Sequence, residues 1–239
     1  MNARSPAPRA TFQEEVLRKL GSDICSGKIR PGELLQPEQE LCERFGFSRI
    51  VIREAIKSLA AKGLIQVRRR TGTLVLEQTR WNLFDPDIIV WRGESAVFDP
   101  MMSRDLMEMR RIIEPAAVRL AALRASDEER RNLRAAYMAM ARAVAGKADY
   151  VKADLAFHTI ILSACGNQFV RQMQDAMAAL LRVNFEVITQ KPGGPANSLP
   201  LHEAVCEAIE RGDADSAERA ALALISEAEI DLNELVPAR

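Results

Sequence analysis

Apolar residues recur at intervals of three and four along most of the chain, which is the period of an amphipathic helix. In the first third, this pattern predicts helices over residues 11–26, 37–45 and 48–59. From residue 103 onward it predicts six more, with glycine and proline at the breaks: 104–123, 127–144, 150–164, 168–189, 201–211 and 214–235. A string of antiparallel helices joined by short loops is typical of an all-α bundle.

The pattern changes once, between residues 64 and 76. Two short β-favouring runs meet at a tip that contains Gly72, which predicts a hairpin. Arg68, Arg69 and Arg70 lie beside that tip. A basic hairpin that follows a basic helix predicts a winged helix-turn-helix, whose wing reaches the DNA backbone or minor groove. A polar hairpin with solvated arginines is the alternative.

The helix before this hairpin combines an apolar face with a basic one. Gly46 favours a stop and Ser48 an N-cap, so a new helix is expected to begin there. Arg49, Arg53 and Lys57 follow at four-residue spacing, beside the apolar stripe of Ile52, Ala55, Ile56 and Leu59. Such a helix can enter the major groove, where arginine pairs with guanine or phosphate. By itself, the same stripe would also fit an ordinary solvated face.

The charge is divided between two parts of the chain. The net charge of all 239 residues is zero, but residues 1–80 hold 15 basic against 9 acidic side chains, and the remainder holds 18 against 24. A basic module joined to an acidic one predicts two parts with different tasks. We therefore expect a disordered tail over 1–10, a winged helix-turn-helix over 11–78, a linker that packs on its neighbours over 79–102, and an all-α domain over 103–239.

Composition excludes several classes of protein. No apolar run is long enough to span a membrane, and the N-terminus lacks the apolar core of a signal peptide. The four cysteines, Cys25, Cys42, Cys165 and Cys206, show neither metal-binding nor disulfide spacing. We expect a cytoplasmic protein with reduced cysteines.

Two histidines, the only ones in the chain, lie in the helical part. His158 follows Asp154 by four residues, so the two side chains share one helix face, and His202 begins another predicted helix. One carboxylate and two imidazoles from neighbouring helices form a plausible divalent-metal site. Hydrogen-bonded core or surface histidines are the alternative, and spacing alone favours it.

The N-terminal part resembles the DNA-binding domain of the GntR family of bacterial transcriptional regulators. The motifs that carry the resemblance are Leu-x-x-Glu-x-Glu-Leu-Cys (35–42), Phe-x-x-Ser-Arg (45–49), Ile-Arg-Glu-Ala (52–55), Leu-x-x-Lys-Gly-Leu-Ile (59–65) and Thr-Gly-Thr-Leu-Val (71–75). The resemblance and the basic stripe together imply DNA contacts from Ser48, Arg49, Ile50, Val51, Arg53, Lys57, Arg69 and Gly72. Gln39 and Ile50 differ from common family residues, so the operator sequence cannot be carried over.

The C-terminal part resembles the FCD effector-binding domain of the FadR subfamily. Its motifs are Glu-Met-Arg-Arg-Ile-Ile-Glu-Pro (108–115), Asp-Leu-Ala-Phe-His (154–158), Gly-Asn (166–167) and Ala-Ile-x-x-Gly-Asp (208–213). The resemblance implies a divalent metal, such as zinc, on Asp154, His158 and His202. A fourth family position, usually histidine, falls on Leu224, which leaves either a three-ligand site or a site that has lost its metal. Arg110 and Arg182 are the candidates for pairing with the carboxylate of an effector.

Three functions follow as hypotheses. The first is a homodimeric transcriptional regulator, a repressor that binds double-stranded operator DNA and is released by a small carboxylate. Features of the linker and the missing last-helix histidine resemble members that respond to a sugar acid such as galactonate. The second is a metal-dependent enzyme that uses the Asp-His-His trio, although no accompanying catalytic motif is present. The third is a sensor of acyl-CoA, which would need a largely apolar pocket.

Overall fold

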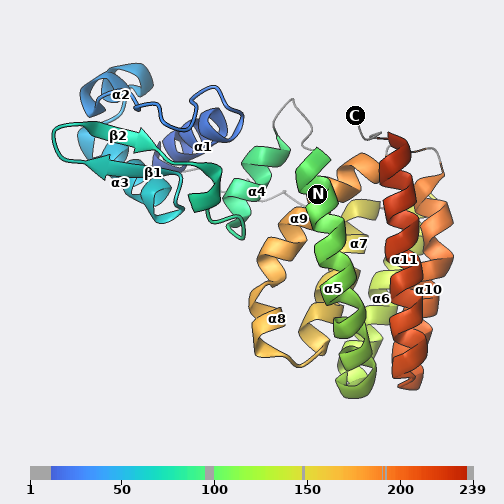
Figure 1. Cartoon of the computed structure of the whole chain (residues 1–239). Coiled ribbons are helices and arrows are strands. Elements are labelled where there is room, and N and C mark those ends of the chain that lie inside the picture. Colours follow the sequence, from blue (N-terminus) through green and yellow to red (C-terminus); the bar gives the residue numbers. More distant parts are fainter. Residues whose placement is uncertain (1–11, 95–99, 147–148, 190, 192, 236–239) are drawn as a thin grey trace, which may run out of the picture. The chain divides into compact units, whose positions relative to one another are not determined.

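The computed structural model describes residues 12–94, 100–146, 149–189, 191 and 193–235. The chain forms two compact units, Met1–Phe98 and Asp99–Arg239. Figure 1 labels their elements. The predicted tail over residues 1–10 lies outside the described residues.

The first unit begins with three helices, α1 (Phe12–Cys25), α2 (Glu38–Phe45) and α3 (Arg49–Ala61). The turn between α2 and α3 has the predicted chemistry. Gly46 ends α2 in the left-handed conformation, with φ 71°. The side chain of Ser48 then accepts a hydrogen bond from the backbone N–H of Val51 and caps α3. A helix-turn-helix results, with the apolar stripe of α3 buried.

The predicted wing is an antiparallel hairpin of β1 (Ile65–Arg68) and β2 (Gly72–Val75). Its register pairs Ile65 with Val75 and Arg68 with Gly72, so residues 69–71 form the tip. Two positive φ angles turn the chain there, 65° at Arg70 and 104° at Gly72. Leu34 forms a single bridge to Leu74, which attaches the segment before α2 to the wing.

Residues 78–93 pack as part of the first unit. They form the 3-10 turn η1 (Gln78–Arg80) and the helix α4 (Pro86–Gly93), which Asp85 caps. The rings of Trp81 and Trp91 are buried in the same core as α1 and α3. Most of the predicted linker, residues 79–102, therefore packs on the DNA-binding part. The first unit ends at Phe98, which is later than the end at residue 78 that was predicted for the DNA-binding domain.

Lys62, at the end of α3, fastens this segment. Its ammonium group lies 2.8 Å from both carboxylate oxygens of Asp85 and 2.7 Å from Asp87. The backbone N–H of Asn82 donates to the carbonyl of Lys62. These contacts join the C-terminal end of α3 directly to the start of α4.

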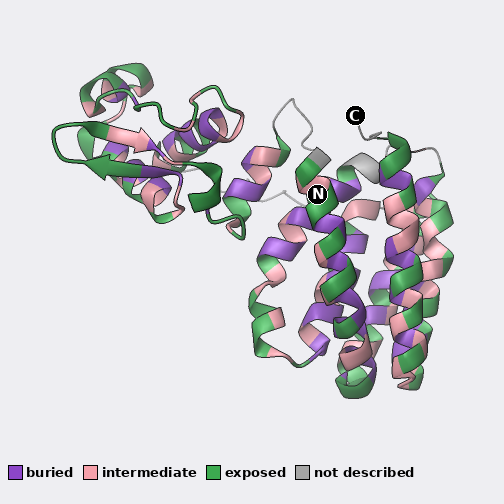
Figure 2. Cartoon of the chain, viewed as in Figure 1, coloured by how far each residue is buried: buried purple, intermediate pink, exposed green. Residues whose placement is uncertain are grey.

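The second unit is entirely helical in its described residues. Its helices are α5 (Pro100–Arg124), α6 (Asp127–Val144), α7 (Tyr150–Ala164), α8 (Gln168–Gln172), α9 (Gln174–Ile188), α10 (Gly194–Arg211) and α11 (Ala214–Leu235). Helix α7 packs against α5, α6 and α9, and α10 and α11 pack on each other and on α5 (Figure 1). Buried residues line their facing sides (Figure 2).

The predicted bundle is confirmed, with two differences in its helices. The predicted helix over 168–189 is divided at Met173 into α8 and α9. The predicted helix over 201–211 begins earlier, at Gly194. The predicted start at 201 left Pro200 outside the helix, whereas it lies in the second turn of α10 and is exposed. Water can therefore solvate the carbonyl group that its missing N–H leaves without a partner.

Candidate metal and effector site and DNA-reading surface

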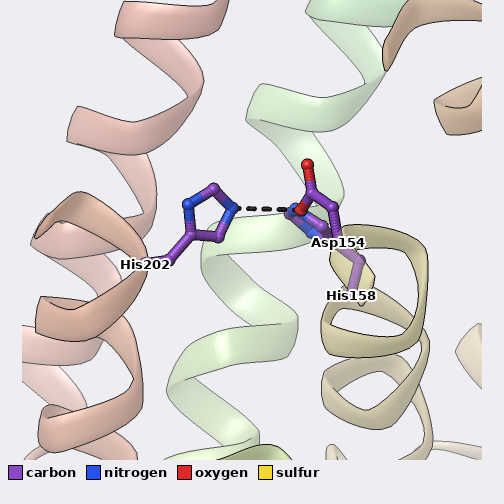
Figure 3. Close-up of side chains that lie close together, drawn as sticks. All are labelled: Asp154, His158 and His202. Carbon is purple, nitrogen blue, oxygen red and sulfur yellow. Dashed lines mark hydrogen bonds and ion pairs between the residues drawn. The ribbon is translucent and has the colours of Figure 1, made fainter. Parts of the chain in front are cut away.

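Asp154, His158 and His202 meet in the interior of the second unit, as Figure 3 shows. Helix α7 supplies Asp154 and His158 from adjacent turns, and α10 supplies His202. The Nε2 atoms of His158 and His202 lie 3.3 Å and 3.1 Å from the same oxygen, Oδ1 of Asp154. All three side chains are buried. The structure thus brings together the three ligands that were predicted from the sequence.

The other nitrogen of each imidazole faces an acceptor. Nδ1 of His202 lies 2.9 Å from the backbone carbonyl of Ser198, and Nδ1 of His158 lies 3.3 Å from Oε2 of Glu114. A carbonyl and a carboxylate accept hydrogen bonds, so in each neutral ring the hydrogen belongs on Nδ1. Both Nε2 lone pairs are then directed toward the carboxylate of Asp154.

This arrangement fits a cation. Nε2 of His158 is buried and has no hydrogen-bond partner. The two nitrogen lone pairs and the negatively charged carboxylate repel one another unless a proton or a metal ion lies between them. Metal–ligand bonds of about 2.0–2.2 Å at tetrahedral angles place donor atoms roughly 3.4 Å apart. The observed 3.1 Å and 3.3 Å are close to that spacing.

Leu224 lies beside the trio. Together with Asp154, His158 and His202, it lines a cavity of about 30 Å³ whose walls come from α5, α7, α9, α10 and α11. A leucine offers no ligand atom, so Asp154, His158 and His202 would be the protein ligands of a bound metal, and its remaining positions would face the cavity. The cavity has room for an ion and about two water molecules. A larger molecule has to widen it.

Glu114 joins the trio to Arg110. Both side chains are buried, and Nε and one terminal nitrogen of Arg110 lie 2.7 Å and 3.4 Å from the two carboxylate oxygens of Glu114. Glu114 thus contacts the guanidinium group on one side and His158 on the other. In the sequence, Glu114 is recognisable only as part of the 108–115 motif. Its position four residues after Arg110 was the available signal.

The two arginines proposed for the effector differ in position. Arg110 lines the cavity, but Glu114 already occupies much of its guanidinium group. Arg182 is exposed on α9 and is not among the residues that line the cavity. The geometry therefore supports Arg110 as an effector ligand and gives Arg182 no support.

The charges of this network lower or raise three pKa values. Burial opposes ionisation of Glu114, but Arg110 and His158 outweigh it and lower its pKa to about 2. Burial alone would lower the pKa of His158, yet Glu114 and Asp154 raise it to about 9. For Asp154, the two histidines overcome burial and hold its pKa well below its usual range. Without a metal, the site therefore retains a proton on His158 at neutral pH.

The second surface of interest is the exposed side of α3. Arg49 and Ile50 begin the helix and are both exposed, Ile50 by 73%. Ser48 caps the helix, and Val51 is half-buried behind it. An exposed isoleucine next to an arginine at a helix start is suited to the floor of the major groove, where it can contact a thymine methyl group.

Two of the side chains predicted to contact DNA form ion pairs with neighbouring carboxylates. Arg53 lies 2.8 Å from Glu38 of α2, and Lys57 lies 2.8 Å from Glu54. Both pairs are exposed, so they are weak and can exchange for phosphate contacts. In the wing, Arg69 and Gly72 are exposed at the tip.

Comparisons with known proteins identify the family of each of the two parts of the chain. Residues 12–75 match the family described as bacterial regulatory proteins, gntR family, and residues 105–227 match the FCD domain. The galactonate operon transcriptional repressor of Escherichia coli is 34% identical, over 93% of this chain and 97% of its own length. This chain belongs to the GntR family.

A second curated relative agrees with this family, and a solved structure shares the fold. The uncharacterized regulator YieP of Escherichia coli is 31% identical over 94% of this chain and 97% of its own length. The solved structure of Lar, which controls the agr system of Listeria monocytogenes, has a TM-score of 0.67 and 21% identity. It covers 96% of this chain and all of its own, and at that identity it supports the fold alone.

The GntR protein is thus a DNA-binding transcriptional regulator with a winged helix-turn-helix and an effector domain, as the sequence predicted. Its family consists of regulators, which removes the hypothesis of a metal-dependent enzyme. Within the described residues, no helix has the length and apolar character needed to cross a membrane.

Proposed function

We propose that this regulator is a homodimeric repressor that leaves its operator when a sugar acid, such as galactonate, binds in the second unit. The observation that carries the proposal is the convergence of Asp154, His158 and His202 beside Arg110 in one cavity. Asp154, His158 and His202 would hold a divalent metal, and zinc suits this set of nitrogen and oxygen ligands.

A hydroxy-carboxylate matches the positive groups of this cavity. A bound divalent ion would supply a Lewis acid with positions open to oxygen ligands. Arg110 would hold the carboxylate through charge-assisted hydrogen bonds, in place of part of its contact with Glu114. The name of the Escherichia coli relative supports galactonate as the first compound to test. An acyl-CoA fits poorly, because charged side chains surround the small cavity.

Binding has to move helices, since the cavity of about 30 Å³ does not admit a six-carbon acid as it stands. The cavity is lined by residues of α5, α7, α9, α10 and α11, so widening it shifts several helices of the effector domain. An effector that prefers the widened form shifts the population toward it. In a homodimer, this shift would change the spacing of the two DNA readers. A homodimer is expected because one recognition helix reads only a few base pairs.

The test combines thermal shift with a gel-shift assay on the full-length protein. D-galactonate should raise Tm, and ethylenediaminetetraacetate should remove that rise and zinc should restore it. D-galactonate should also release operator DNA. His158→Ala should abolish release while operator binding without effector stays within about twofold. A wild-type Tm unchanged by every sugar acid, with and without zinc, would disprove the proposal.

The oligomeric state is tested separately. Light scattering of the free protein and of its operator complex should give the mass of two chains. A monomer in both states would overturn the homodimer.

A further inference from the structure

The end of the cavity that lies farther along α11 carries a buried carboxylate that the metal and effector sites do not use. Asp231 is only 2% exposed and lines the same cavity as His202. One oxygen of Asp231, Oδ1, lies 2.5 Å from the ammonium group of Lys191. A buried charge costs stability unless it is paired, and its retention at a cavity wall needs a reason.

Holding Lys191 in place does not require Asp231. Glu234, one turn further along α11, lies 2.7 Å from the same ammonium group, and its side chain is 59% exposed. An exposed pair of this kind fastens Lys191 without the cost of burial. Asp231 is therefore a second carboxylate beside Lys191, and unlike Glu234 it also faces the cavity.

The wall formed by α11 changes from apolar to acidic. Leu224, Ala228 and Asp231 line the cavity at i, i+4 and i+7, on one face of the helix, and Glu227 lines it beside them. Seven residues of helix rise by about 10 Å. A six-carbon acid with its terminal groups can span this length, from the cavity wall at Leu224 to Asp231, whereas a two-carbon acid cannot.

Charge fixes the direction of such a ligand. The carboxylate of the ligand is repelled by Asp231 and Glu227. It is attracted by Arg110 and by the divalent ion that the metal site would hold. The hydroxylated chain of the ligand therefore extends toward Asp231 and Glu227. A carboxylate has about four acceptor sites, of which Lys191 occupies one on Asp231. The remaining sites can accept hydrogen bonds from hydroxyl groups.

We infer that Asp231 is a specificity residue that binds the hydroxyl groups of a polyhydroxy acid and so selects long sugar acids over short hydroxy acids. This inference rests on the proposed function. It assigns the discrimination by chain length to the α11 end of the cavity, and the binding of the shared hydroxy-carboxylate group to the metal and Arg110 end.

The experiment measures zinc-loaded full-length protein by isothermal titration with glycolate, glycerate, threonate and D-galactonate. In the wild type, affinity should increase along this series, by about tenfold or more in total. Asp231→Asn should remove most of this increase and change glycolate affinity by less than about twofold. Glu234→Gln, which removes the exposed partner of Lys191, should retain the increase and serves as the matched control.

A second variant tests the same end of the cavity without altering a charge. Ala228→Leu fills the wall between Leu224 and Asp231, and should weaken D-galactonate but leave glycolate binding intact. Binding of glycolate shows that each variant is folded. If Asp231→Asn does not fold, the affinities of Ala228→Leu for D-galactonate and glycolate test the inference instead.

The outcomes separate the inference from the proposed function. A folded Asp231→Asn variant that keeps the full increase would overturn the inference alone. If Asp231→Asn does not fold, an Ala228→Leu variant that keeps the increase has the same meaning. A wild type that binds none of the four acids would overturn both the proposed function and the inference.

Discussion

Nδ1 of His158 lies 3.3 Å from a carboxylate oxygen of Glu114, and both side chains are buried in the second unit. Glu114 therefore orients the imidazole of His158 and leaves its Nε2 directed toward Asp154. A carboxylate behind a metal-binding histidine sets the tautomer and raises the basicity of the ring. The same carboxylate pairs with Arg110, so one residue contacts both the proposed metal ligand His158 and the proposed effector ligand Arg110.

Glu114→Gln should weaken zinc binding by roughly 10- to 100-fold, since the neutral amide no longer holds the Nδ1 hydrogen as strongly. Competition titration with a chelating dye measures the change. Glu108→Gln is the control, because Glu108 is exposed on the same helix. Equal zinc affinity in both variants would contradict the supporting role of Glu114.

The metal-free protein should lose stability as pH rises through about 9. The pKa of His158 is raised from 6.5 to about 9 in the folded state, chiefly because Glu114 and Asp154 outweigh burial. Its contribution is therefore fully present below 6.5 and disappears as the imidazolium loses its proton. Chemical unfolding of the chelator-treated protein at pH 6.5 and 9.5 measures this loss.

His158→Gln should remove the part of the loss that depends on this proton. Zinc should also diminish the loss of stability at high pH, because the ion takes the place of the proton among Asp154, His158 and His202. Because a proton and the zinc ion compete for His158, zinc affinity should decline as pH falls below about 9. The unperturbed histidine pKa would have placed this decline near 6.5. A decline that begins only near 6.5 would count against the raised pKa.

Arg49→Ala and Arg53→Ala should each weaken operator binding by about 1–3 kcal/mol. Arg53 first has to leave its exposed ion pair with Glu38, so its loss should be the smaller of the two. Fluorescence anisotropy with labelled operator gives the affinities. Arg142→Ala, at an exposed position of α6, should have no effect. Wild-type affinity in both α3 variants would refute the assignment of the recognition helix.

Gly21→Ala should destabilise the first unit by about 1–3 kcal/mol, through overpacking. A Cβ atom at this position of α1 would lie 2.3 Å from the ring of Trp91, so α4 would have to move away. Chemical unfolding followed by tryptophan fluorescence measures the effect. Ser22→Ala is a neighbouring control. A fully stable Gly21→Ala variant would show that α4 does not need its close packing on α1.

Local sequence determined the helices, the wing and the recognition helix. The predicted ends of α6, α7 and α11 agree with the structure, because their caps and apolar periods act within a few residues. The same applies to the N-cap at Ser48 and the turn at Gly46. Four-residue spacing also placed Asp154 and His158 on one face.

Tertiary structure decided what those faces meet. The sequence did not show that Glu114 would connect Arg110 to His158, because that relation depends on how α5 packs against α7. Neither did it show that Glu38 would hold Arg53, that Arg182 would face outward, or that Asp231 would share a cavity with His202. Periodicity reports which side of a helix is buried, whereas a site forms only where particular turns of different helices come into contact.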